Sequence, residues 1–339
     1  MTAVPLVGIR CDATAATGLG HLSRCLGFAE ALKERGCSIR FIGDYGARAG
    51  EMLATAGMDH EHHEGWNGRD IAARLPDASG VIVDGYRADE NTLQQINATL
   101  PVLVIDDFAR LTRYDCQAIL NFTVGAPALP YPLPRARCLL GPGHLLVRRR
   151  LRTLRAQLRT LAPVGQRIVL SFGGGTWQSA ARASLQALHD LAPDAEVMVV
   201  AGAGADEGVD EVLQRFRNGG QLLRGLPDLA APFAWADTCV SGGGLTKYEA
   251  AYLGLPVAVL SGTDDESDET VQFTAAGLAI DLGRPSEVDR TRLRGSLERL
   301  LSDTGLRQQL HAATQARFPA DPTANAATAW LKIVKEVRV

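Results

Sequence analysis

A histidine follows a glycine-rich turn near the start of the chain, in Thr17-Gly18-Leu19-Gly20-His21. The apolar run 4–10 before the turn predicts a strand, and the apolar spacing of 26–32 predicts a helix. Amide groups at such a junction favour an anion, and an imidazole there can act as a general base because imidazole titrates near neutral pH. A tight turn with a capping histidine is the alternative. The third glycine of the dinucleotide-binding fingerprint is missing, which disfavours a dehydrogenase.

Two further glycine-rich turns follow predicted strands in the second half, at 171–176 and 240–246. Glycines let backbone amides approach a phosphate, and the helix predicted after the second turn adds its positive N-terminal end. Glu249 lies one turn into that helix, where a carboxylate suits the two hydroxyls of a ribose. Lys247 follows Thr246, whereas a P-loop lysine precedes its Ser or Thr, so a kinase or ATPase is disfavoured. The pair of turns favours phosphate and ribose binding over plain connecting turns.

Strand-like and helix-like segments alternate along both halves, which predicts two doubly wound parallel sheets in an α/β protein. The predicted strands are 4–10, 38–43, 80–84, 102–107, 118–121, 167–172, 195–201, 222–226, 237–241 and 256–260. The predicted helices are 25–35, 50–56, 69–75, 90–100, 179–191, 229–236, 247–253 and 321–337.

A change in composition separates the two halves. Four prolines fall within 127–134 and five arginines within 148–155. We predict an N-terminal domain of residues 1–155, a C-terminal domain of residues 156–320, and a helix in residues 321–339 that crosses back to the first domain. The arginine run could meet a phosphate or carboxylate, but a solvated linker helix is the favoured interpretation.

The composition is that of an ordinary globular protein, with 339 residues, 46% hydrophobic residues and a net charge of −3. This charge predicts no nucleic-acid partner, and the strand-length apolar runs predict no membrane segment. Six scattered cysteines without a CxxC pair favour reduced thiols and a cytoplasmic location. The cluster His60-Glu61-His62-His63-Glu64 lacks the spacing of a zinc helix, so a surface role is favoured over a metal site.

Taken together, these motifs are similar to the GT-B glycosyltransferase superfamily. The segment 18–26 most resembles the nucleotide-sugar hydrolases of pseudaminic acid biosynthesis and their spore-coat relatives. Further matches run along nearly the whole chain, at 84–86, 106–107, 120–121, 141–148, 171–174 and 242–250. The resemblance implies two Rossmann-like domains that face a central cleft, with no cofactor and no metal.

The resemblance also implies a reaction: hydrolysis of a UDP-linked amino or deoxy sugar with inversion, releasing the free sugar and UDP without a metal. His21 would orient or deprotonate the attacking water, and Asp12 and Asp107 would line the sugar side as further catalytic residues. The implied substrate contacts are Gly18, Gly20, Arg24, Tyr86, Gly173, Gly174, Ser241, Gly243, Gly244, Leu245, Thr246, Glu249 and Gln272.

The alternative is an inverting GT-B glycosyltransferase, in which His21 deprotonates an acceptor instead of water. The two readings share every motif because a base can serve either nucleophile. A non-catalytic sugar-nucleotide-binding protein and a nucleotide-sugar epimerase are less favoured, the first because His21 is present. An acidic loop is predicted at 262–269, where the acids either bind an ammonium or hydroxyl-rich group or are solvated.

Overall fold

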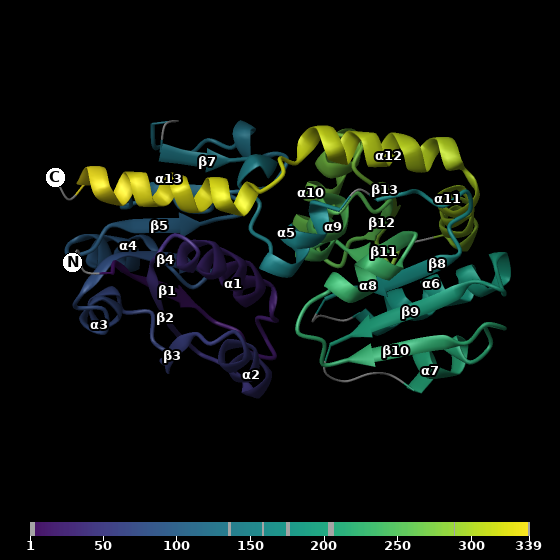
Figure 1. The fold of residues 1–339 in the computed structure, drawn as a ribbon, viewed down its shortest axis with the longest axis horizontal. Coiled ribbons are helices and arrows are strands. Elements are labelled where there is room, and N and C mark those ends of the chain that lie inside the picture. The colour runs from purple at the N-terminus through teal and green to yellow at the C-terminus, as the bar shows by residue number, and fades with distance from the viewer. Residues whose placement is uncertain are drawn as a thin grey trace. The chain divides into compact units, whose positions relative to one another are not determined.

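The fold is known from a computed structural model, which describes residues 4–134, 137–157, 159–173, 177–202, 207–287 and 289–337. The chain divides into two compact units (Figure 1): unit 1 contains residues 1–149 and 321–339, and unit 2 contains residues 150–320. Each unit is built on one parallel sheet. The predicted α/β class with two doubly wound, Rossmann-like sheets is therefore confirmed.

Unit 1 has a seven-stranded sheet in the order β3-β2-β1-β4-β5-β6-β7, and all neighbouring strands are parallel. Strands β4, β5 and β6 are completely buried, as expected for a sheet covered on both faces. The chain order changes direction between β1 and β4. The strands are β1 (Leu6–Cys11), β2 (Ser38–Gly43), β3 (Asp59–His62), β4 (Ala78–Asp84), β5 (Val102–Ile105), β6 (Ala118–Asn121) and β7 (Cys138–Leu140).

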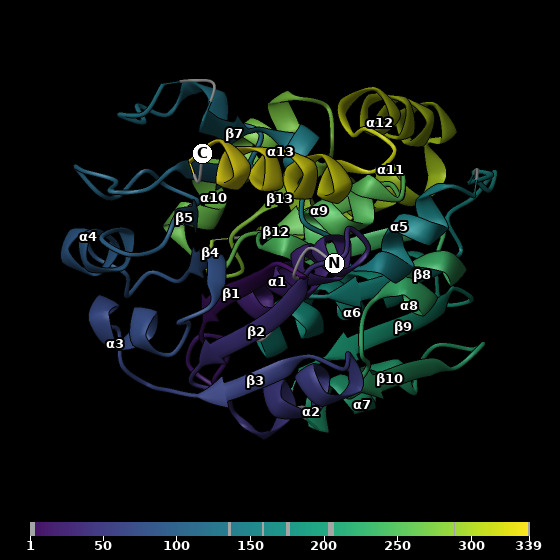
Figure 2. The same ribbon diagram turned by 60° about the vertical axis from the view of Figure 1, so that its left-hand side comes forward.

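The last helix of the chain packs beside the first one in unit 1 (Figures 1 and 2). Arg35 donates a hydrogen bond to Thr328 at 3.1 Å, and buried Trp330 lies so close to Gly80 that a Cβ there would be 2.8 Å from its ring. The last helix therefore completes the core of unit 1. The helices are α1 (Gly20–Lys33), α2 (Ala47–Thr55), α3 (Gly68–Ala73), α4 (Glu90–Asn97) and α13 (Pro322–Val337), with short 3-10 helices η1 (Ala126–Ala128) and η3 (Pro142–His144).

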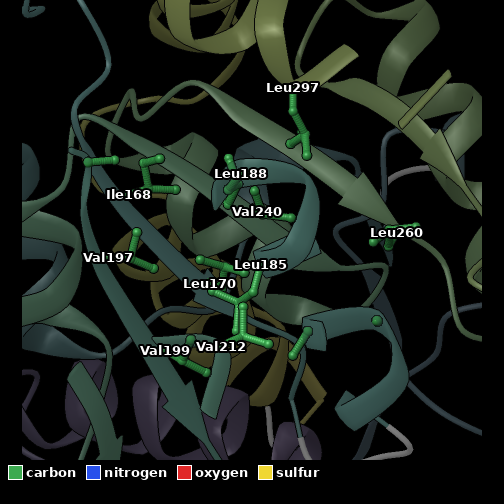
Figure 3. Close-up of a cluster of buried hydrophobic side chains, with 14 of the residues drawn as sticks. Ile168, Leu170, Leu185, Leu188, Val197, Val199, Val212, Val240, Leu260 and Leu297 are labelled. Carbon is green, nitrogen blue, oxygen red and sulfur yellow. The ribbon is translucent and has the colours of Figure 1, made fainter. Parts of the chain in front are cut away.

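Unit 2 has a six-stranded parallel sheet in the order β10-β9-β8-β11-β12-β13. Figure 3 shows its core, in which Leu170 and Val240 of the central strands cluster with Leu185 and Leu297 of two helices. The strands are β8 (Arg167–Ser171), β9 (Glu196–Ala201), β10 (Gly220–Arg224), β11 (Thr238–Gly242), β12 (Val257–Leu260) and β13 (Ile280–Gly283). The helices are α5 (Arg149–Arg155), α6 (Trp177–Leu191), α7 (Glu207–Leu213), α8 (Ala230–Trp235), α9 (Leu245–Tyr252), α10 (Asp264–Ala275), α11 (Arg290–Ser302) and α12 (Thr304–Arg317).

Several elements differ from the sequence prediction: strands β3, β7 and β13 and helices α7, α11 and α12 were not predicted, and one predicted loop is helical. Strand β3 was not predicted because its residues are all polar or charged; it pairs only with β2 at the sheet edge, where such side chains stay in water. The predicted acidic loop is instead the start of α10. Thr263 caps this helix by accepting a hydrogen bond from the amide of Glu266 at 3.2 Å, and acids in a first helical turn are favourable to the helix dipole.

All six cysteines are free thiols, and five of them are buried. Among the helices that the structure describes, none combines the length and apolar character needed to span a membrane.

Candidate active site

The carboxyl ends of β1 and β4 lie side by side where the strand order of unit 1 changes direction. Open parallel sheets bind ligands at this position. The loop after β1 leads through Gly18, whose φ of 70° favours glycine, to Gly20 at the start of α1. His21 lies in the first turn of α1, and Asp84 is the last residue of β4. The fold therefore joins two residues that are 63 positions apart in the sequence.

The imidazole of His21 is held by two neighbours. Its Nδ1 atom lies 2.6 Å from Oδ1 of the buried Asp84, and the ring of Tyr86 packs edge-on against it with 4.9 Å between centroids. A histidine that donates its Nδ1 proton to a carboxylate keeps Nε2 as its basic nitrogen. Within the described part of the chain, no residue hydrogen-bonds this Nε2 atom. His21 is therefore arranged to accept a proton from a ligand.

Asp84 is completely buried and accepts hydrogen bonds from three side chains. The donors are Nδ1 of His21, Nε and Nη2 of Arg24, both at 2.7 Å, and the thiol of Cys25 at 3.2 Å. Burial opposes ionisation, but the charges of Arg24 and His21 outweigh it and hold the pKa of Asp84 well below its usual range. Nη2 of Arg24 also lies 3.1 Å from Nδ1 of His21. An ionised carboxylate can only accept a hydrogen bond, so the proton between Nδ1 and Asp84 belongs to the histidine.

Arg24 bridges Asp84 to a second acid, Asp107, which follows β5. Its Nη1 and Nη2 atoms lie 2.7 and 3.0 Å from the two Asp107 oxygens. Burial of Asp107 opposes its charge, but Arg24 outweighs this effect and lowers the pKa of that carboxyl. Arg24 is 6% exposed and engaged by both acids, so it orients Asp84 and Asp107. Its contact with a substrate stays a prediction.

Tyr86 and the loop after β5 present an aromatic surface next to His21. Tyr86 is 55% exposed, and its hydroxyl donates to Oδ2 of Asp107 at 2.7 Å. Desolvation of this hydroxyl and the charge of Asp107 raise the pKa of Tyr86, so it stays a hydrogen-bond donor. The guanidinium of Arg110 lies 4.8 Å from the Tyr86 ring centroid and 4.5 Å from that of Phe108. Tyr86 is thus placed where a sugar ring could stack.

Asp12, which was predicted as catalytic, makes several structural contacts. It is 5% exposed and pairs with Arg10. It also accepts hydrogen bonds from the indole of Trp66 and from the amide of Asp44, each at 2.9 Å. Both carboxylate oxygens are thereby engaged, and neither contacts His21. These contacts tie the loop after β1 to the end of β2, and the catalytic role of Asp12 stays a prediction.

In unit 2 the strand order changes direction between β8 and β11, and glycines follow both strands. Gly173 has a φ of 75°, while Gly174 lies outside the described residues. A Cβ on Gly242 would lie 3.0 Å from a backbone carbonyl oxygen after β8, and one on Gly243 would lie 2.6 Å from the side chain of Glu266. The turn after β11 therefore has no room for side chains at these two positions.

Gly244 is the N-cap of α9 and is exposed, and no side chain caps this helix. The first amides of a helix lack partners within it, and the helix dipole adds to their attraction for an anion. Leu245 and Thr246 are partly exposed in this turn. A Cβ on Gly244 would lie 3.6 Å from the Glu266 carboxylate, which accepts from the amide of Gly262 at 2.7 Å. This carboxylate opposes an anion, so binding here depends on how the amides point.

The three other predicted contacts in unit 2 differ in their surroundings. Ser241 is fully buried, and its hydroxyl donates to the carbonyl oxygen of Gly242 at 3.1 Å, so it stabilises the turn, while its contact with a ligand stays a prediction. Glu249 is 6% exposed, and Gln272 is exposed on α10. Their contacts with a ribose and a sugar stay predictions.

The histidine cluster lies at the exposed edge of unit 1. The potential ligand atoms of Asp44, His62 and Glu64 fall within 4.8 Å of one another. The His62 and Glu64 side chains are 57% and 75% exposed, and metal sites normally orient their ligands through buried hydrogen-bond partners. This arrangement agrees with the surface interpretation.

The arginine run combines exposed side chains, such as Arg149 and Arg150, with two ion pairs. Arg148 pairs with Glu30 at 3.0 Å, and Arg150 pairs with Asp228 at 3.3 Å. Arg155 donates to the carbonyl oxygen of Phe318 at 3.0 Å. These contacts leave the run no evident role in binding a phosphate.

The sequence analysis assigned no role to Asp84, although the structure pairs it with His21. In the segment 84–86 it assigned a role only to Tyr86. A signal was available, because Asp84 ends an apolar strand just as Asp106 and Asp107 do, and acids at the carboxyl ends of parallel strands gather at the ligand edge of the sheet.

Two known proteins resemble this chain in sequence over most of its length. No family model matches the chain. It is 26% identical over 318 residues to the spore coat polysaccharide biosynthesis protein SpsG of Bacillus subtilis (strain 168), covering 90% of this chain and 91% of that protein. It is also 26% identical over 361 residues to the UDP-N-acetylglucosamine–N-acetylmuramyl-(pentapeptide) pyrophosphoryl-undecaprenol N-acetylglucosamine transferase of Halorhodospira halophila (strain DSM 244 / SL1), covering 95% and 98%.

Solved structures resemble the chain over its whole length. LpCGTa in complex with UDP matches with a TM-score of 0.70 and 17% identity, covering 98% of this chain and 99% of that one. CalG4, the calicheamicin glycosyltransferase, matches with a TM-score of 0.66 and 14% identity, covering 100% of both chains. The protein therefore has the two-domain, Rossmann-like fold of the GT-B glycosyltransferases.

Proposed function

We propose that this protein is an inverting glycosyltransferase that uses a UDP-linked amino sugar as its donor. The observation that carries the proposal is the 2.6 Å contact between Nδ1 of His21 and buried Asp84, which leaves Nε2 as a base. In unit 2, the amides of the Gly242–Gly244 turn and of the first turn of α9 suit the diphosphate of UDP.

The proposed reaction is a single displacement. The acceptor oxygen or nitrogen attacks the anomeric carbon as its proton passes to Nε2 of His21. The bond between the anomeric carbon and the UDP oxygen breaks, and UDP departs with the electron pair. Attack from the face opposite UDP inverts the anomeric configuration. Asp84 stabilises the imidazolium that forms, and the amides of unit 2 stabilise the negative charge on UDP.

Names among the similar proteins favour transfer over the hydrolysis that the sequence motifs imply. The Halorhodospira halophila relative is named as a transferase that uses UDP-N-acetylglucosamine, and the CalG4 structure is that of a glycosyltransferase. The LpCGTa structure contains UDP, which supports a UDP-sugar donor. The SpsG similarity supports a role in polysaccharide synthesis.

The test compares UDP release with and without acceptors. The protein is incubated with UDP-N-acetylglucosamine and related UDP-amino sugars, first alone and then with a panel of hydroxyl- and amine-bearing sugars and sugar phosphates. We expect donor binding without turnover in the first case and acceptor-dependent UDP release in the second, with an inverted linkage by NMR. A GDP-sugar is the matched control.

Prompt UDP release with no acceptor present, at a rate that acceptors do not increase, would overturn the transferase and assign the hydrolase. Absence of any binding to UDP or UDP-sugars would overturn both.

A further inference from the structure

Lys247 is the only lysine in residues 150–320, and it is completely buried. It is the third residue of α9, directly beneath the Gly242–Gly244 turn. Lysine is almost never fully buried unless its ammonium group is paired. Neither the proposed displacement nor the predicted ligand contacts use this residue.

The ammonium group of Lys247 has an acceptor for each of its three protons. It donates to the carbonyl oxygen of Gly243, to the hydroxyl of Thr270 at 3.1 Å, and to Glu269, with which it forms an ion pair. Tyr248 donates to the other oxygen of Glu269. The ammonium is therefore held in one place, and so is the Gly243 carbonyl that it binds.

Holding the Gly243 carbonyl also sets the direction of the next amide. The chain contains no cis peptide bond among its described residues, and in a trans peptide the C=O and the following N–H point in opposite directions. Because Lys247 draws the Gly243 oxygen inward, the amide of Gly244 is turned outward. Gly244 is exposed, whereas Gly243 is buried.

Two glycines in a row would not maintain this orientation by themselves. Without a Cβ, either face of a Gly-Gly peptide is sterically accessible, so the peptide can flip at little cost. The flipped form would present the Gly243 carbonyl to the ligand, and a carbonyl oxygen repels a phosphate. A hydrogen bond to a charged donor disfavours that form.

The charge of Lys247 does not itself attract the ligand. Glu269 neutralises it, and the Glu266 carboxylate lies beside the turn. An anion at this turn would therefore be held by the positive N-terminal end of α9 and by the outward-pointing amides.

We propose that Lys247 is a positioning residue for the diphosphate site: it locks the Gly243–Gly244 peptide with its N–H toward the ligand. This inference rests on the proposed function, in which UDP binds at this turn. It predicts selective loss of diphosphate recognition when the lysine is removed, with uridine recognition retained.

The experiment measures the affinities of UDP and of uridine by calorimetry. Lys247→Met alone leaves the carboxylate of Glu269 without its cation, so the main variant is Lys247→Met/Glu269→Gln, which removes the ion pair but keeps an acceptor for Tyr248. Arg292→Met, which removes an exposed charge from α11 of the same unit, is the matched control. Melting temperatures of all variants are recorded.

We expect the double variant to lose about tenfold or more in UDP affinity, to keep the uridine affinity of the wild type, and to regain no UDP affinity when salt is lowered. The control should bind both ligands as the wild type does. Retention of the full UDP-over-uridine preference in the folded double variant would overturn the inference and leave the transferase intact. Equal loss of both affinities would also overturn it, by showing a general structural role.

A wild type with no preference for UDP over uridine would overturn the inference too, because the turn would then bind no diphosphate. Acceptor-dependent UDP release by the wild type, measured separately, shows whether the proposed function survives that result.

Discussion

The two units carry different types of residue at the same position of their sheets. Their sheets share one strand order, in which the first and fourth strands of each unit are neighbours: β1 and β4 in unit 1, β8 and β11 in unit 2. In unit 1 this position holds ionisable side chains, with His21, Asp84, Arg24 and Asp107 in one hydrogen-bonded network. In unit 2 it holds glycines and the uncapped start of a helix.

This difference follows from what each task requires. A proton acceptor must be a side chain with a suitable titration range, and it needs a second group that fixes its orientation. An anion site needs several N–H donors at close range, which side chains would obstruct. The fold thus provides the same position twice, and under the proposed function the residues after the strands make one position catalytic and the other a binding site.

The largest effect is expected for His21→Ala. Turnover should fall on the order of 10²- to 10⁴-fold because the base is lost, while the UDP affinity measured by calorimetry stays unchanged. His62→Ala removes an exposed histidine of the same unit and serves as the control. If His21→Ala lowered UDP affinity as much as turnover, the proposal that unit 1 supplies the base and unit 2 binds UDP would be contradicted.

Asp84→Asn should reduce turnover on the order of 10²-fold, less than removal of the base itself. The amide can offer an N–H to Nδ1 of His21, which favours the wrong tautomer, and it no longer stabilises the imidazolium. Steady-state kinetics should show the loss in kcat more than in KM. Asp106→Asn is the matched control, since Asp106 is a buried acid directly after the neighbouring strand β5 and accepts hydrogen bonds from Tyr114 and Tyr131 at 2.9 and 2.8 Å. Equal losses in both variants would contradict the pairing.

Gly244→Ala should weaken UDP binding about tenfold, because a methyl group would cover the exposed amides of the turn. The folded protein should be little affected, since the nearest atom to the new Cβ would be 3.6 Å away. Titration with UDP checks the affinity, and thermal melting checks the fold. Gly295→Ala in α11 has open space around its Cβ and is the control. Unchanged UDP affinity would move the diphosphate away from this turn.

The smallest effect concerns acid stability. Asp84 and Asp107 have pKa values lowered by Arg24, although burial opposes this, so each is more acidic in the folded than in the unfolded chain. Their stabilising contribution is present above the ordinary carboxyl range and is lost as the pH falls below about 4. Urea unfolding at a series of pH values should show wild type more stable than Asp107→Asn by on the order of 2 kcal/mol at pH 7, with a difference that shrinks on acidification. A difference independent of pH would refute this coupling.

The sequence by itself determined much of the architecture. The alternation of apolar runs with helical spacing predicted most strands and helices within a few residues, because these patterns reflect burial of local segments. It also singled out His21 and the Gly242–Gly244 turn, because glycines mark the connections from a strand to a helix, and their roles stay predictions. It missed β3, whose polar residues carry no apolar alternation, it assigned no element to β7, β13, α7, α11 or α12, and it treated the start of α10 as a loop.

Tertiary structure decided which of the candidate groups act together. The spacing of Asp12, Asp84, Asp106 and Asp107 in the sequence does not reveal that only Asp84 reaches His21, because that contact depends on β4 lying next to β1. The same holds for Lys247, whose position in a helix was predictable but whose contacts with Glu269 and Thr270 arise from the packing of α10 against the turn. Local sequence patterns report what one segment buries, whereas the partner of a buried charge is set by which segments the fold makes neighbours.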